Sequence, residues 1–170
     1  MPTTFEAVTV TAVLASAGTG AAVDLYTRRV PNLLTVPVAS LGIVAAAAGF
    51  VDLTMGEAMV GFAIGMILML PGYLWGGTGG GDVKLMAALG TWLGPSLIVR
   101  TFVYSAIAGG VLALIIAVHR RRVGATLRGA ARLVAAPRST KREVEATGSA
   151  NRFPYAPAIA AGTVLAVLGL

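Results

Sequence analysis

The chain has 170 residues, of which 56% are hydrophobic and 12% are charged, whereas soluble domains carry about 25% charged residues. Its formal net charge is +6, and it has one histidine and no cysteine. This composition predicts one all-α domain of packed membrane helices over residues 1–170. It excludes disulfides, thiolate metal sites, a cysteine nucleophile and any site built from several histidines.

The first apolar stretch, residues 7–23, is predicted to be a retained membrane span. A cleaved signal peptide needs a basic N-terminal region, whereas residues 1–7 hold no basic residue and include Glu6. A polar cluster at residues 24–32 follows, and it leads to a second predicted span at residues 33–50.

The third predicted span, residues 58–75, ends at a run of glycines that leads into Asp82. A fourth helix at residues 82–93 is short for a full crossing, and the Gly-Pro-Ser sequence at 94–96 predicts a turn after it. The fifth predicted span covers residues 97–118.

A long polar segment rich in arginine, residues 119–152, separates the fifth span from a last one at residues 153–170. Six spans place this segment on the same side as the polar loops at 24–32 and 76–84. That side then holds every one of the 13 basic residues except Arg100. The positive-inside rule makes it the cytoplasmic side and places both termini outside.

The basic charge does not predict binding to nucleic acid. It lies next to the membrane, where topology and attraction to anionic lipid headgroups explain it. Membrane lipid is therefore an expected partner of the chain, and nucleic acid is not.

Two further features of the predicted spans have structural rather than catalytic explanations. Trp75 and Trp92, one near each face of the membrane, are predicted to be interfacial anchors. Gly61 and Gly65 form a GxxxG step, which predicts internal helix packing rather than dimerisation.

Two aspartates are the candidate catalytic residues. With six spans, Asp24 closes the first span and Asp82 opens the fourth, so both carboxylates reach the cytoplasmic boundary, where ionisable groups are functional candidates. Two adjacent carboxylates can share one proton. The ionised one then acts as general base on a water, and the protonated one donates to the carbonyl oxygen under attack. This pair would hydrolyse a peptide without a metal or a cofactor.

Each aspartate also has a structural interpretation. Asp24 would pair with Arg28 if the first helix continues, and Asp82 would cap the fourth helix. An alternative function is a small transporter or proton-coupled carrier that uses both acids as relay groups. A carrier favours acids near the bilayer midplane and paired broken helices, whereas both acids here lie at span ends.

The glycines before Asp82 predict an approach path for an extended substrate. Glycine permits a positive φ and close approach of another backbone, so Gly79, Gly80 and Gly81 would let a strand-like peptide lie beside the acid. A flexible loop is the alternative. A phosphate-binding loop is excluded, because Asp82 stands where that motif requires Gly-Lys-Ser/Thr.

Three segments occur together in a specific order. Residues 79–90, Gly-Gly-Gly-Asp-Val-Lys-Leu-Met-Ala-Ala-Leu-Gly, contain the GxGD motif of membrane aspartic proteases and resemble the second-aspartate region of type IV prepilin peptidases. Asp24 with Arg-Val-Pro-Asn at 29–32 resembles the first-aspartate region, and residues 154–160 resemble the start of the final helix. The resemblance implies a multi-pass protease of the bacterial inner membrane. It would remove the basic leader of prepilin or pseudopilin substrates, with Asp24 and Asp82 as the catalytic pair.

The resemblance also bears on three basic residues. Arg28, Arg29 and Lys84 stand where family members carry basic residues, and they are expected to contact substrate or lipid rather than to catalyse. Lys84 is about 200° around a helix from Asp82, so it is expected to face elsewhere and to extend toward the headgroups.

Larger members of the family carry an N-terminal cytoplasmic domain, often with paired CxxC motifs, that is linked to N-methylation of the mature pilin. This chain has no room for such a domain before residue 7 and has no cysteine. It resembles the short, peptidase-only form of tight-adherence (Flp) pilus systems, so we expect no methyltransferase domain and no methyltransferase activity.

Overall fold

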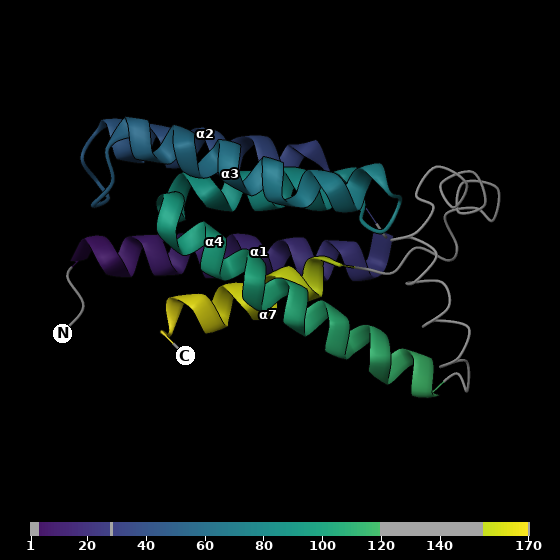
Figure 1. Cartoon of the computed structure of the whole chain (residues 1–170). Coiled ribbons are helices and arrows are strands. Elements are labelled where there is room, and N and C mark those ends of the chain that lie inside the picture. Colours follow the sequence, from purple (N-terminus) through teal and green to yellow (C-terminus); the bar gives the residue numbers. More distant parts are fainter. Residues whose placement is uncertain (1–3, 28, 120–154, 170) are drawn as a thin grey trace.

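The computed structural model describes residues 4–27, 29–119 and 155–169, and these residues are almost entirely helical (Figure 1). The all-α prediction is therefore confirmed for this part of the chain. The basic segment predicted at 119–152 lies outside it except for its first residue. The helices are α1 (Thr4–Thr27), α2 (Asn32–Ala47), α3 (Met55–Leu74), α4 (Gly80–His119) and α7 (Ala156–Val167).

The helix α4 contains the turn that the sequence predicts. Gly94 has φ 68° and ψ −177°, a conformation that glycine adopts without strain, and Pro95 follows with a φ suited to the start of a helix. Figure 1 shows the chain reversing its direction there. We therefore treat α4 as a first arm, residues 80–93, and a second arm, residues 95–119.

Counted with two arms of α4, the described helical segments run alternately up and down the bundle (Figure 1). The end of α1, the α3–α4 connection and the start of α7 lie at one end, which we call the site end. The start of α1 and the end of α7 lie at the opposite end. This alternation is the one that six crossings require.

Three of the described helices are long and apolar enough to cross a membrane. They cover residues 7–27, 55–74 and 80–115, the last of which includes both arms of α4, while α2 and α7 are shorter apolar helices. Many large apolar side chains on these helices are exposed, as expected where lipid replaces water. The chain is thus a membrane protein by composition and helix length, and the number and orientation of the crossings stay predictions.

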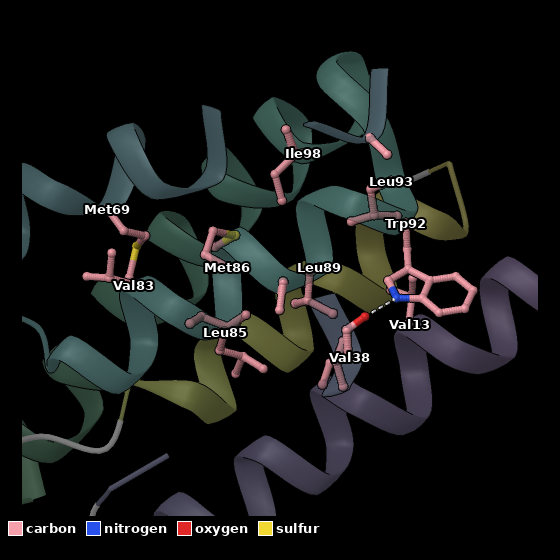
Figure 2. Close-up of a cluster of buried hydrophobic side chains, with 14 of the residues drawn as sticks. Val13, Val38, Met69, Val83, Leu85, Met86, Leu89, Trp92, Leu93 and Ile98 are labelled. Atoms are coloured by element: carbon pink, nitrogen blue, oxygen red, sulfur yellow. Dashed lines mark hydrogen bonds between the residues drawn. The ribbon is translucent and has the colours of Figure 1, made fainter. Parts of the chain in front are cut away.

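The first arm of α4 forms the centre of the bundle. Leu85, Met86 and Leu89 are fully buried there, among side chains from the other helices (Figure 2). On α3, a Cβ added to Gly65 would lie 2.6 Å from the Met86 carbonyl oxygen, and one added to Gly61 would overlap the Gly90 carbonyl. The two helices therefore meet backbone to backbone, which confirms the internal packing predicted from the GxxxG step.

Trp92 is not the interfacial anchor that the sequence predicts. Its side chain is 8% exposed, and its Nε1 donates a hydrogen bond of 2.9 Å to the Val38 carbonyl oxygen of α2 (Figure 2). The indole N–H thus finds its partner inside the protein. Trp75, at the end of α3, is 44% exposed.

Candidate functional site

Asp24 lies in the last turn of α1, which extends to Thr27. Its side chain is only 5% exposed. Its Oδ2 accepts a hydrogen bond of 3.3 Å from the backbone N–H of Ala156, the first residue of α7. A helix N-terminus is a favourable neighbour for a carboxylate, because its first N–H groups have no partner within the helix. The predicted pairing with Arg28 falls on a residue outside the described part of the chain.

Asp82 lies in the first turn of α4, which begins at Gly80, two residues earlier than predicted. It is also 5% exposed, and its Oδ2 accepts a hydrogen bond of 2.9 Å from the Gly79 N–H. This bond is one half of a capping box, in which the side chain of the third helical residue accepts a hydrogen bond from the backbone N–H of the residue before the helix. Asp82 thus caps the start of α4 from the third helical position, and not from the position before the helix as the capping interpretation supposed.

The start of α7 holds one of the two acids. The N–H of Ala156 donates to Asp24, and the preceding Tyr155 is half-buried. Its hydroxyl donates a hydrogen bond of 3.2 Å to the Ser105 carbonyl in the second arm of α4. Sequence reasoning missed Tyr155 as a site residue. The available signal was its place in the resembling segment 154–160.

The glycine run before Asp82 has at least three structural roles. Gly76, with φ 80°, ends α3 in a Schellman motif, in which the N–H of Gly77 bonds the Gly72 carbonyl. Gly79 is the residue that Asp82 caps. At Gly81, an added Cβ would lie 2.9 Å from the backbone N and O of Val30 in the α1–α2 link.

Lys84 also binds that link. Its Nζ donates a hydrogen bond of 2.8 Å to Oδ1 of Asn32, the first residue of α2. The expectation that Lys84 extends away to the headgroups is therefore incomplete, because its ammonium has a partner within the chain. The two contacts, Gly81 with Val30 and Lys84 with Asn32, join the segment after Asp24 to the segment around Asp82, and we call them the brace. Arg29 is exposed, whereas Arg28 is not among the described residues.

Gly81→Ala separates the packing role of this glycine from the predicted substrate path. If the brace packs as seen, the methyl group forces Val30 aside, and we expect a loss of about 1–3 kcal/mol in the free energy of unfolding, measured in detergent with no substrate present. Gly77→Ala is the matched control in the same run, because its Cβ would lie 3.5 Å from the Gly72 carbonyl oxygen, which is an ordinary van der Waals contact. An unchanged stability with a raised KM would instead favour the substrate path.

No metal cluster is formed by the residues at 4–27, 29–119 and 155–169: no three acidic, histidine or cysteine side chains gather there as ligands would. What the site end does contain is two buried carboxylates, each held by a backbone N–H from a helix start. Such a pair suits proton transfer and the activation of water.

The sequence matches known proteins over most of its length. A model of the type IV leader peptidase family matches residues 10–114, which include both aspartates and the glycine run. The chain is also 32% identical over 127 residues to the prepilin leader peptidase/N-methyltransferase of Bacillus subtilis (strain 168). That match covers 75% of this chain and 36% of the relative, so the chain spans little more than a third of that protein. No solved structure matches significantly.

Proposed function

Because this chain belongs to the type IV leader peptidase family, we propose that it is a membrane aspartic endopeptidase that removes the leader peptide from prepilin-like substrates. The observation that carries the proposal is a pair of buried carboxylates, Asp24 in the last turn of α1 and Asp82 in the first turn of α4. These two helix ends lie at the same end of the bundle (Figure 1). The family match includes both aspartates. The carrier alternative is not favoured by the family.

In the proposed reaction the two aspartates share one proton. The ionised carboxylate removes a proton from a water, whose oxygen adds to the carbonyl carbon of the scissile peptide bond. The protonated carboxylate donates to the carbonyl oxygen. The tetrahedral intermediate then collapses, the C–N bond breaks, and a proton passes to the leaving amine. Two carboxylates that share one proton lose it as a pair, so we assign neither role to a single residue.

The substrate would be a small prepilin or pseudopilin with a basic leader and an apolar helix. That helix would dock among the spans and present the junction to the site end, which we place at the cytoplasmic face of the bacterial inner membrane because the neighbouring loops are basic. In this arrangement both termini lie outside. Arg29 and Lys84 are proposed contacts for substrate or lipid headgroups. Lys84 would use the ammonium N–H groups that do not bind Asn32.

Methyl transfer is a separate activity in the name of the Bacillus subtilis relative. The proposal for this chain covers peptide cleavage alone, and the expected lack of methyl transfer stays a prediction. Mass spectrometry of a cleaved pilin incubated with the purified chain and S-adenosylmethionine tests it: a gain of one methyl group at the new N-terminus would contradict the expectation.

The direct test is cleavage of a co-expressed prepilin, followed by the change in its size. We expect the wild-type chain to remove the leader at one bond, identified by N-terminal sequencing of the product. The competing carrier has a distinct signature. A folded wild-type chain that leaves the prepilin intact, but drives a proton or solute flux in vesicles that Asp82→Asn abolishes, would overturn the peptidase in favour of the carrier.

A further inference from the structure

The side chain of Tyr155 fills a slot on the second arm of α4. An added Cβ at Gly109 would lie 2.6 Å from Cε2 of the tyrosine ring and 3.1 Å from its Cζ and hydroxyl oxygen. The hydroxyl donates to the carbonyl of Ser105, four residues earlier and hence one turn away on the same face. The slot thus depends on the absence of a side chain at Gly109.

This slot sets the direction in which the chain enters α7. Tyr155 has helical φ and ψ of −90° and −20°, and Pro157 restricts the backbone just after it. The N–H of Ala156, between them, therefore has little freedom of its own. It is the N–H that donates to Asp24, and Ala156 is fully buried.

Further along, α7 packs on α4 at a second point: a Cβ on Gly162 would lie 2.6 Å from Cα of Ser105. Of these two contacts with the second arm, the one made by Tyr155 lies next to the Ala156 N–H that donates to Asp24.

We propose that Tyr155 is a positioning residue of the site: seated against Gly109 and Ser105, it holds the Ala156 N–H on Asp24. The start of α7 is then a third component of the site, along with the end of α1 and the start of α4. This inference rests on the proposed peptidase function for its effect on rate, although the placement itself can be tested without activity.

The kinetic test uses two adjacent glycines of α4. Gly109→Ala pushes the ring out of its slot without changing Tyr155, whereas a Cβ on Gly110 meets nothing within 4 Å, so Gly110→Ala is the matched control. We expect Gly109→Ala to lower kcat about 10- to 100-fold with KM changed less than about twofold, because small misplacements of reacting groups have effects of this size. Gly110→Ala should stay within about twofold of wild type in both constants.

Variants of Tyr155 test whether its ring is the cause of the effect of Gly109→Ala. Tyr155→Ala should lower kcat as much as Gly109→Ala does, and Tyr155→Phe, which keeps the ring, should restore most of the rate. Gly109→Ala added to Tyr155→Ala should cost nothing further, since no ring remains to be displaced. Equal rates for Gly109→Ala and Gly110→Ala, or effects of Gly109→Ala and Tyr155→Ala that multiply, would overturn the proposal.

Hydrogen exchange tests the placement independently of activity. The Ala156 N–H is buried and donates to Asp24, so it should exchange slowly with deuterium in the wild-type chain. Gly109→Ala and Tyr155→Ala should each speed this exchange, whereas Gly110→Ala should not. An Ala156 N–H whose exchange is unchanged by Gly109→Ala would disprove the placement even in an active enzyme. Faster exchange in Gly109→Ala, in a protein whose wild type cleaves no prepilin, would retain the placement and reject the peptidase.

Discussion

Asp24→Asn and Asp82→Asn are each expected to lower the rate of prepilin cleavage at least ~10²-fold, because general acid–base catalysis by a positioned group contributes about 10²–10⁴-fold. Asparagine has nearly the shape of aspartate but cannot exchange a proton. If the pair shares one proton, replacing either member removes both the base and the acid of the proposed reaction. The measurement is single-turnover cleavage by chain purified in detergent.

Asparagine was chosen because it preserves the contacts that the structure shows. Its side-chain oxygen can still accept from the Gly79 N–H at position 82 and from the Ala156 N–H at position 24, so the folded state should survive. Asp52→Asn is the matched control, because Asp52 is an exposed acid in the α2–α3 connection. It should cleave at the wild-type rate.

Alanine at position 82 separates capping from catalysis. Losing the hydrogen bond from the Gly79 N–H should cost about 0.5–1.5 kcal/mol of stability, so Asp82→Ala should unfold more easily than Asp82→Asn while being equally inactive. If Asp82→Asn cleaves normally and Asp82→Ala is merely less stable, then Asp82 is a capping residue alone. The two-carboxylate mechanism would then be wrong.

Gly61→Ala and Gly90→Ala are expected to have the largest effects on stability. An added Cβ on either glycine overlaps the backbone carbonyl of the other, so a methyl group at either position must separate α3 from the first arm of α4. Overpacking of this kind costs about 1–3 kcal/mol. Because neither obstacle is a movable side chain, we expect values at the upper end of that range, measured as the free energy of unfolding in mixed detergent micelles.

Two comparisons test whether the helix contact is the cause. Gly18→Ala introduces the same methyl group on α1, where nothing lies within 4 Å, and should leave stability unchanged or raise it slightly. The double variant Gly61→Ala with Gly90→Ala should be less destabilised than the sum of the single variants, since one separation of the helices accommodates both methyl groups. Additive effects would place the damage elsewhere.

The helices and the turn at Gly94 were predictable because their signals are local. Apolar runs of membrane length, a glycine followed by a proline, and polar links between the runs are all visible in a window of about 20 residues. The two aspartates were also accessible, since each stands at the boundary of such a run. The tryptophan at position 92 was misjudged because position along a span predicts depth and not which side faces lipid.

The contacts that join the site were not predictable in the same way. Asp24 and Ala156 are 132 residues apart, and nothing in either neighbourhood indicates that a backbone N–H of one reaches the carboxylate of the other. Gly81 is similar: the glycine run suggested room for a substrate, whereas the structure places the Val30 backbone against it. In both cases a main-chain group is the partner, and main-chain groups have no sequence signature.

The bond between Asp24 and Ala156 also orders events during synthesis. The carboxylate leaves the ribosome before its partner, which is made more than a hundred residues later. Until α7 has joined the other helices, a nascent chain holds Asp24 without the N–H that anchors it. The anchored arrangement of Asp24 is therefore completed late in assembly, and the proposed hydrolysis would require the assembled bundle rather than its first helices.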